Sequence, residues 1–195
     1  MLNMIILLLS YFIGSIPFAL VIGKSFYNTD IRGYGSGNLG ATNSFRILGK
    51  TAGTIVAFAD LLKGIIACVL PMALHSNVSP ALCGLLAIIG HAFPVFAGFK
   101  GGKAVATSAG VFLFLAPLGT FLACMVFLIS LLSSKYVSLS SMLGIISILI
   151  YSLFFEGRPI IALSSFICLF VVILHRENIK RIWKGTEAKV GRTFK

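Results

Sequence analysis

The sequence predicts an all-α integral membrane protein, a bundle of seven transmembrane helices of which some are short or kinked. Composition is the first reason: hydrophobic residues make up 58% of the chain and charged residues 11%, whereas a soluble domain carries about 25% charged residues. Long stretches without charged residues, apart from one Asp/Lys pair, are the second reason. The pieces between them fall short of the roughly 40 residues that a separate soluble domain needs. We therefore expect residues 1–195 to form one transmembrane domain.

Seven spans follow from the lengths of these stretches. A helix needs about 20 residues to cross a hydrocarbon core, and five stretches supply one span each. The stretch 104–134 is long for one helix and short for two, and Pro117 and Gly119 divide it where a helix most readily ends. Pro17 and Pro94 are expected to kink their helices. The expected spans are 2–23, 51–74, 79–99, 104–116, 118–134, 136–155 and 159–174.

The distribution of basic residues orients this bundle. With seven spans and the N-terminus outside, 14 of the 16 Lys and Arg residues lie on the cytoplasmic side, seven of them in the tail 175–195. A single span at 104–134 would move that tail outside, against the positive-inside tendency. We therefore expect a cytoplasmic C-terminus and a first helix that is retained rather than cleaved as a signal peptide.

Two classes of function are disfavoured by charge and cysteine placement. The net charge of +11 does not indicate nucleic-acid binding, because the basic residues form short clusters beside apolar stretches. The four cysteines lie within apolar stretches, without CxxC spacing or a nearby His pair, so neither a metal site nor a disulfide framework is indicated. We expect no metal, no other cofactor and no nucleic-acid partner.

The first polar region on the expected cytoplasmic side is a glycine-rich loop, residues 33–43, followed by Arg46. Its glycines let backbone N–H groups converge on an anion, and polar side chains add donors. A flexible linker is the alternative, although linkers favour Ser and Gly without clustered Asn, Thr and Arg. The GxGxxG match is weak as a dinucleotide motif, because a helix precedes it. The candidate phosphate contacts are Gly35, Ser36, Gly37, Asn38, Gly40, Thr42, Asn43 and Arg46.

The second region is the sequence KGGK, residues 100–103, directly before the expected fourth span. Free N–H groups of Gly101 and Gly102, a helix N-terminus and the Lys103 ammonium would together suit phosphate. For Lys100 a positive-inside anchor is the better interpretation, whereas for Lys103 the anchor and the phosphate ligand stay equally open.

The third region begins at His175, where the last span ends. His175 and Asn178 are three residues apart and should share a helical face, while Glu177 points elsewhere. A histidine at the interface titrates near neutral pH and an asparagine both donates and accepts, but ordinary capping is the alternative. Ser141 and neighbouring serines at the start of the sixth span are weaker candidates, because serines there are commonly helix caps.

Three polar residues lie within the expected spans. Asp60 and Lys63 are spaced i, i+3 and can neutralise each other, which favours a structural pair. His91 either is a satisfied buried group or lines the site, and the sequence does not choose.

Phosphate-type donors on one side of a membrane bundle indicate a phosphate substrate from the cytosol, and lipid synthesis fits this geometry. The chain offers no paired nucleophile and base of the Ser/His/Asp kind, and the His-x4-Asp pattern of many lipid acyltransferases is missing. A membrane transporter of a phosphate ester is the alternative, but it would need a polar path to the outer face. A scaffold that binds anionic lipid with its tail would leave the glycine-rich loops unexplained.

Three segments together resemble a known family: GSGNLGATN with Arg46, GHAFPVF with FKGGKAVAT, and HRENIKRIWKGTE. In this order they resemble the signature regions of the bacterial acyl-phosphate:glycerol-3-phosphate acyltransferases, the PlsY family, over nearly the whole chain. The resemblance implies a multi-pass protein of the bacterial inner membrane with its active site on the cytoplasmic side. It implies transfer of a fatty acyl group from acyl-phosphate to the 1-hydroxyl of glycerol-3-phosphate, giving 1-acyl-glycerol-3-phosphate (lysophosphatidic acid) and phosphate. The implied partners are these substrates, the lipid bilayer and, transiently, the soluble enzyme that makes acyl-phosphate.

The resemblance also implies roles for residues at matching positions. The catalytic positions are Ser36, Arg46, Lys103, His175 and Asn178, and the further phosphate-binding positions of the second region and the sixth span are Gly101, Gly102 and Ser141. Glu177 matches a residue thought to support structure. The family usually has Gly where this chain has Ala104, which is a mild change if Ala104 lies in the first turn of a helix.

The chemistry of an acyl-phosphate agrees with this assignment. Phosphate is a good leaving group, so the protein mainly has to hold two phosphates and orient the hydroxyl toward the carbonyl. We expect direct attack without an acyl-enzyme, with the hydroxyl proton taken by an oxygen of the donor phosphate. His175 is the rival base.

Overall fold

The computed structural model describes residues 1–191, in which it contains ten α-helices, two short 3-10 helices and no strand. The α-helices are α1 (Leu2–Ser15), α2 (Phe18–Tyr27), α3 (Ala41–Ile47), α4 (Lys50–Ala73), α5 (Pro80–Ala92), α6 (Val105–Leu115), α7 (Pro117–Ser134), α8 (Val137–Phe155), α9 (Arg158–Leu174) and α10 (Arg176–Trp183). The 3-10 helices are η1 (Ile31–Gly33) and η2 (Val95–Ala97). Two of the seven basic residues of the tail, Arg192 and Lys195, lie outside the described residues.

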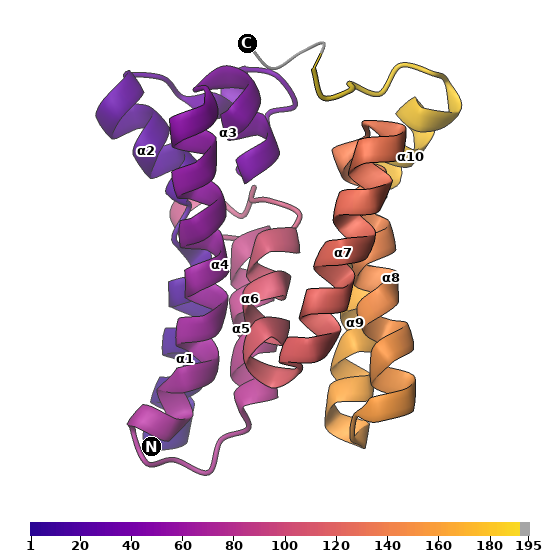
Figure 1. Ribbon diagram of the computed structural model, residues 1–195. Helices are drawn as coiled ribbons and strands as arrows, with labels where there is room; N and C mark the ends of the chain where they lie inside the picture. The colour runs from indigo at the N-terminus through magenta and orange to yellow at the C-terminus, as the bar shows by residue number, and fades with distance from the viewer. Residues whose placement is uncertain (192–195) are drawn as a thin grey trace. The chain divides into compact units, whose positions relative to one another are not determined.

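The chain divides into two compact units, residues 1–114 and the part that begins at Leu115. The first unit holds α1 to α5 and all of α6 except its last residue, and the second holds α7 to α10 (Figure 1). The all-α prediction is confirmed, whereas the prediction that residues 1–195 form one domain stays a prediction.

Several helices are long and apolar enough to cross a membrane. Four segments meet this test alone: Lys50–Ala73, Pro80–Ala97, Pro117–Ser134 and Val137–Phe155. The bent pairs α1 with α2 and α9 with α10 raise the number to six if each is one span, and α6 is a shorter apolar helix of 11 residues. The predicted count of seven spans and the predicted sidedness of the termini stay predictions.

Prolines set two of the helix ends in the first unit. α1 and α2 are separated by Ile16 and Pro17, and their axes differ by 46°, so the expected kink at Pro17 is observed as a break. Pro94 does not kink α5. The helix ends at Ala92, and Phe93 has φ −126° and ψ 65°, because the residue before a proline avoids the α region.

Glycines let the helices of the first unit pack backbone against backbone. A Cβ at Gly14 of α1 would overlap the backbone of Ala87 in α5, and one at Gly90 of α5 would overlap the carbonyl of Tyr11. Close contact between small residues is the usual source of cohesion among helices in lipid, where the hydrophobic effect is missing.

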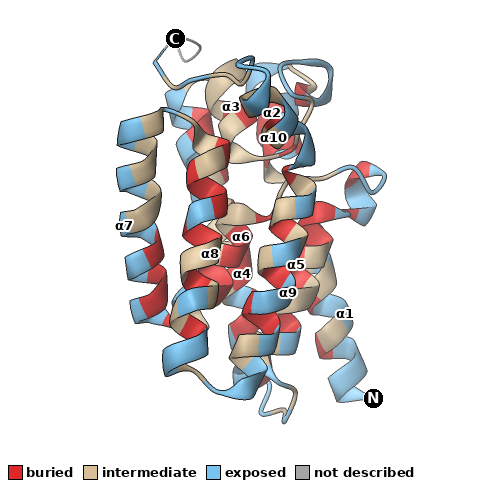
Figure 2. Cartoon of the chain, turned by 90° about the vertical axis from the view of Figure 1, so that its right-hand side faces the viewer, coloured by how far each residue is buried: buried red, intermediate tan, exposed pale blue. Residues whose placement is uncertain are grey.

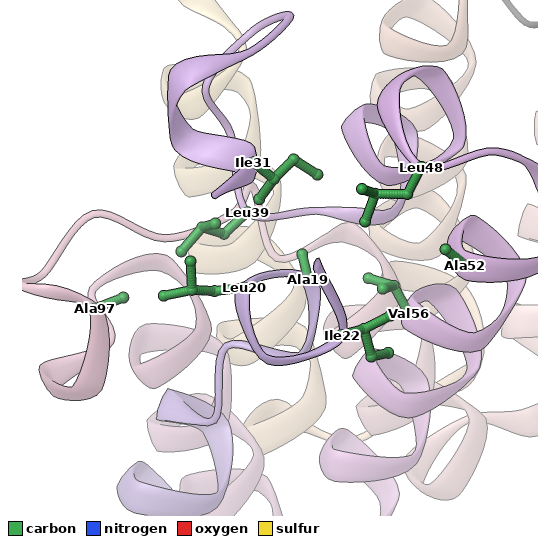
Figure 3. Packing of buried hydrophobic residues seen from close by; sticks show 9 residues of the cluster. All are labelled: Ala19, Leu20, Ile22, Ile31, Leu39, Leu48, Ala52, Val56 and Ala97. Atoms are coloured by element: carbon green, nitrogen blue, oxygen red, sulfur yellow. The ribbon is translucent and has the colours of Figure 1, made fainter. Parts of the chain in front are cut away.

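A cluster of buried apolar residues, called the loop anchor below, holds the glycine-rich loop on α2 and α4 (Figure 3). Its members are Ala19, Leu20, Ile22, Ile31, Leu39, Leu48, Ala52, Val56 and Ala97. Ile31 and Leu39 flank the glycine-rich part of the loop and are 0% and 3% exposed. Both ends of the loop are therefore pinned, while residues 32–36 between them stay exposed.

In the second unit α8 contacts both α7 and α9. Most of α7 is exposed or half-buried (Figure 2), with 17% of its residues buried, as expected for a helix that faces lipid. α10 bends by 55° from α9 at His175 and packs against α8 and α9.

Candidate functional site

The glycine-rich loop has a defined structure, which a flexible linker would lack. Gly35 has a φ of +60°, a conformation that glycine adopts without strain. The Asn43 side chain accepts a hydrogen bond from the Ser36 N–H at 3.0 Å and donates to the Tyr34 carbonyl at 3.1 Å and the Ile31 carbonyl at 3.4 Å. The loop therefore folds around Asn43, which is 2% exposed.

Asn43 has a role inside the loop that the sequence did not predict. Its amide bonds to the loop backbone, and a Cβ at Gly35 would overlap its Oδ1. Gly35 is therefore needed both for its φ and for the space that Asn43 occupies. Direct contact of either residue with a phosphate stays a prediction.

Ser36 and Arg46 are better placed than Asn43 to bind an external anion. Ser36 is exposed on the loop. Arg46 lies in α3, and its Nε is buried without a hydrogen-bond partner among residues 1–191. A buried donor without a partner costs free energy, and the oxygen of a bound phosphate would offset that cost. Gly37, Gly40 and Thr42 are partly buried, and their contacts with phosphate stay predictions.

The KGGK segment packs under the end of α5 through its two glycines. The Gly101 N–H donates to the Ala92 carbonyl at 3.2 Å, and the Gly102 N–H donates to the His91 carbonyl at 3.1 Å. The prediction that these N–H groups are free is therefore wrong. Helix ends leave carbonyls without intrahelical partners, and the two glycines supply partners for the last carbonyls of α5.

The two glycine-bearing segments contact each other within the first unit. The Leu39 N–H and the Asn38 Nδ2 both donate to the Gly101 carbonyl, at 3.4 and 3.3 Å. One carbonyl therefore holds the loop that leads into the Arg46 helix against the segment that ends in Lys103. The structure thus brings together two of the three regions that the sequence singled out.

Ala104 does not lie where the sequence analysis expected it. α6 begins at Val105, and Ala104 precedes it with φ +59° and no exposed surface. The expectation of a mild change in a helical first turn is wrong, because a side chain in the left-handed region costs about 1–2 kcal/mol. Glycine at this position would be free of that strain.

Asp60, Lys63 and His91 form a buried polar network in the first unit. The Lys63 Nζ lies 2.8 Å from the Asp60 Oδ1 and donates to the Ile16 carbonyl at 3.0 Å. The His91 Nδ1 lies 3.4 Å from the same Asp60 oxygen. The expected Asp60–Lys63 pair is present, and His91 is a buried group with a charged partner.

The third region lies in the second unit, at the bend between α9 and α10. The His175 Nδ1 is 2.8 Å from the Val171 carbonyl, and the Asn178 Nδ2 donates to the Glu187 Oε1 at 2.6 Å. His175 and Asn178 are buried whereas Glu177 is exposed, so the predicted shared face is observed.

Glu187 is a residue that the sequence analysis missed. Its carboxylate accepts hydrogen bonds from the Asn178 Nδ2 at 2.6 Å, the Ser138 Oγ at 2.6 Å and the Arg181 Nε at 2.7 Å. Burial by itself would raise the pKa of Glu187, but the three donors outweigh it and hold the pKa below its ordinary value. A single acidic residue near the end of a basic tail is the signal that marks it in the sequence.

Within residues 1–191, the ion-pair partners of Glu177 are the exposed side chains of Arg176 and Lys180. The Glu177 side chain is 56% exposed and pairs with Lys180 at 3.1 Å, and an exposed pair of this kind stabilises little. Glu187 ties α10 to α8 instead. Ser141 is buried and donates to the Val137 carbonyl at 2.8 Å, and its contact with a substrate phosphate stays a prediction.

Comparison with known proteins matches this arrangement to one family. The family model described as glycerol-3-phosphate acyltransferase matches residues 4–185. The chain belongs to this family. Glycerol-3-phosphate acyltransferase 2 of Bacillus anthracis is 63% identical over 96% of this chain and 99% of its own. The glycerol-3-phosphate acyltransferase of Bacillus subtilis (strain 168) is 50% identical over 97% of this chain and 98% of its own.

Solved structures agree with the family assignment. The chain is similar to the crystal structure of PlsY (YgiH), an integral membrane glycerol 3-phosphate acyltransferase, in its glycerol 3-phosphate form. The TM-score is 0.91 and the identity 36%, over 98% of this chain and 96% of that one. The lysphosphatidic acid form of the same protein matches with a TM-score of 0.88 and 35% identity, over 98% and 96% of the two chains. The predicted family and the predicted integral membrane fold are confirmed.

Proposed function

We propose that the chain transfers a fatty acyl group from acyl-phosphate to the 1-hydroxyl of glycerol-3-phosphate. The products are 1-acyl-glycerol-3-phosphate and phosphate, so the reaction would be the first acylation of bacterial phospholipid synthesis. Membership of the glycerol-3-phosphate acyltransferase family supports the acceptor and the reaction class. The observation that carries the proposal is the contact of two glycine-bearing segments on the Gly101 carbonyl, which joins the regions of Arg46 and Lys103.

Acyl-phosphate is the proposed donor because it needs no covalent catalysis. The hydroxyl oxygen attacks the acyl carbonyl carbon, the bond from that carbon to the phosphate oxygen breaks, and phosphate leaves. The hydroxyl proton passes to a phosphate oxygen of the donor. The cations Arg46 and Lys103 would offset the charge of two phosphates, and Ser36 would help to orient them.

His175 is the rival base for the hydroxyl proton. Its Nδ1 faces the Val171 carbonyl at 2.8 Å, so in the neutral ring Nδ1 donates and Nε2 is the acceptor. The variant His175→Gln should keep most of the pH dependence of kcat if the substrate phosphate takes the proton. Loss of that dependence together with most of kcat would assign the proton to His175.

The proposed location is the bacterial inner membrane, with the site on the cytoplasmic side. The donor would arrive from a soluble enzyme that makes acyl-phosphate, through transient contact with the membrane protein. The apolar helices α4, α7 and α8 support a multi-pass arrangement.

The experiment uses purified protein in lipid vesicles with labelled glycerol-3-phosphate and either acyl-phosphate or acyl-CoA as donor. With acyl-phosphate as donor we expect lysophosphatidic acid and phosphate in equal amounts. With acyl-CoA as donor we expect no product. Product from acyl-CoA alone would overturn the proposed donor. Uptake of label without product would overturn the enzyme and favour a transporter.

Two pairs of variants test the phosphate sites in the same assay. Arg46→Ala and Lys103→Ala should each lower kcat/KM by about 10²-fold or more, because each removes a charged donor from a developing anion. The matched controls remove exposed cations near these sites: Arg32→Ala just before the glycine-rich loop and Lys100→Ala in KGGK. Both should stay within about twofold of wild type. Equal losses in a variant and its control would overturn the assigned sites.

A further inference from the structure

We propose that His91, held by Asp60, is a positioning residue that sets the KGGK segment in place and so aims Lys103 at substrate phosphate. The proposal rests on the proposed function, and it adds a role for a buried network that the reaction itself leaves unused. The contacts that support this role all lie within the first unit.

The network starts from a fixed point at the break between α1 and α2. The Lys63 Nζ donates to the Ile16 carbonyl at 3.0 Å and lies 5.8 Å from the centre of the Phe18 ring. The same ammonium is 2.8 Å from the Asp60 Oδ1. Lys63 and Asp60 are 3% and 2% exposed, so the carboxylate cannot exchange this partner for water. Asp60 is therefore a fixed, charged acceptor inside the helix bundle of this unit.

Asp60 in turn orients the imidazole of His91. The His91 Nδ1 lies 3.4 Å from the Asp60 Oδ1, so Nδ1 carries the proton and the opposite edge of the ring, with Nε2, points away from Asp60. That edge lies against Gly102, because a Cβ built on Gly102 would overlap Nε2. Gly102 is buried, and only a residue without a side chain fits beside the ring.

His91 holds Gly102 by its backbone as well as by its ring. The His91 carbonyl accepts the Gly102 N–H at 3.1 Å. The next residue is Lys103, and the preceding Gly101 presents its carbonyl to Leu39 and Asn38 of the glycine-rich loop. A change in the ring position would therefore move Lys103 relative to that loop. Misplacing a phosphate ligand by about 1 Å can cost up to about 100-fold in rate.

The first experiment is a pair of histidine variants of the full-length chain in vesicles. His91→Asn keeps an N–H near the Nδ1 position for Asp60 but removes the ring edge that packs against Gly102. We expect the KM of the substrate whose phosphate Lys103 binds to rise about tenfold or more, with the KM of the other substrate within about twofold. The matched control His75→Asn lies in an exposed turn and should leave both KM values unchanged.

A merely structural role for His91 would reduce the amount of folded enzyme and leave both KM values of the folded fraction unchanged. That result, measured on protein that elutes as a single folded species, would overturn the proposal. Should His91→Asn fail to fold, Gly102→Ala takes its place, because its Cβ disturbs the same ring contact from the other side. The same rise in one of the two KM values is expected.

The second experiment tests the contact between the ring and Gly102 directly. Gly102→Ala should lose about 100-fold in kcat/KM because its Cβ displaces the His91 ring. The double variant with His91→Asn has room for that Cβ, so we expect it to regain at least about tenfold over Gly102→Ala alone. Losses that multiply in the double variant would overturn the proposal, since the Cβ would then obstruct something other than the ring.

These outcomes separate the two proposals. A wild-type protein that makes no lysophosphatidic acid from either donor overturns the proposed function. An active wild-type protein whose His91→Asn variant keeps both KM values overturns only the positioning role.

Discussion

The two units hold their candidate site residues by different means. In the first unit, carbonyls of His91, Ala92 and Gly101 accept N–H groups from the two glycine-bearing segments. In the second unit, one carboxylate, that of Glu187, accepts hydrogen bonds from three side chains of α8 and α10. A segment held by backbone contacts is sensitive to added atoms, whereas a helix held by one carboxylate is sensitive to loss of charge. Different kinds of substitution should therefore destabilise the two units.

The largest effect is expected from Glu187→Ala in the second unit. The change leaves three donors without their acceptor, one of them the charged guanidinium of Arg181, and should lower the free energy of unfolding by about 3 kcal/mol. Thermal unfolding in detergent measures it. Glu177→Ala in α10 is the matched acidic control, and its exposed side chain predicts an unchanged melting temperature. Equal losses in both variants would show that Glu187 does not anchor α10.

In the first unit, the substitution expected to destabilise the fold is one that adds a side-chain carbon to a tightly packed glycine. Gly101→Ala would place a Cβ against the His91 carbonyl and the Pro94 ring, and overpacking of this kind costs about 1–3 kcal/mol. Gly33→Ala is the matched control, because a Cβ there meets nothing within 4 Å. Urea unfolding of both variants should separate them. A Gly101→Ala variant as stable as its control would contradict the close packing of KGGK against α5.

A smaller effect of opposite sign is expected at Ala104. Ala104→Gly removes a side chain from a residue with φ +59° and should raise the free energy of unfolding by about 1 kcal/mol. The same change in the middle of α6, Ala109→Gly, should lower it by about 1 kcal/mol. A loss of stability in both variants would show that the contacts of the buried Ala104 methyl group outweigh the strain of its positive φ.

The smallest effect is the pH dependence of the second unit. The pKa of Glu187 is held below its ordinary value of 4.5, so its contribution to stability is fully present above that value. It is lost as the pH falls through the lowered pKa of the folded state. Melting temperatures measured down to pH 3 should fall further for wild type than for Glu187→Gln, which has no carboxylate to protonate. Parallel curves would show that the charge of Glu187 does not stabilise the fold.

Hydrophobic stretches and prolines predicted much of the fold. The division of residues 104–134 at Pro117 is observed as α6 and α7, with Pro117 as the first residue of α7, because proline lacks the N–H that a helix interior needs. The break at Pro17 has the same cause. The short helix α3 has no apolar stretch of its own, so hydropathy gave no sign of it.

The candidate site was less predictable, because its contacts join residues far apart in the sequence. The prediction that Ser36, Arg46 and Lys103 bind an anion stays a prediction. The sequence did not indicate that the Gly101 and Gly102 N–H groups donate to the last carbonyls of α5. These hydrogen bonds depend on how the chain returns to that helix after Pro94. Glu187 was missed for the same reason. Its carboxylate accepts hydrogen bonds from two other parts of the chain, and the sequence does not show that these lie close to it.

Rapid mixing of the protein with acyl-phosphate alone tests most directly whether the acyl group passes from bound acyl-phosphate straight to the hydroxyl of glycerol-3-phosphate. We predict that no phosphate is released until glycerol-3-phosphate is added, after which phosphate and lysophosphatidic acid appear together. A burst of phosphate equal to the amount of protein, with the acyl group retained on the chain, would contradict this direct transfer and reveal an acyl-enzyme.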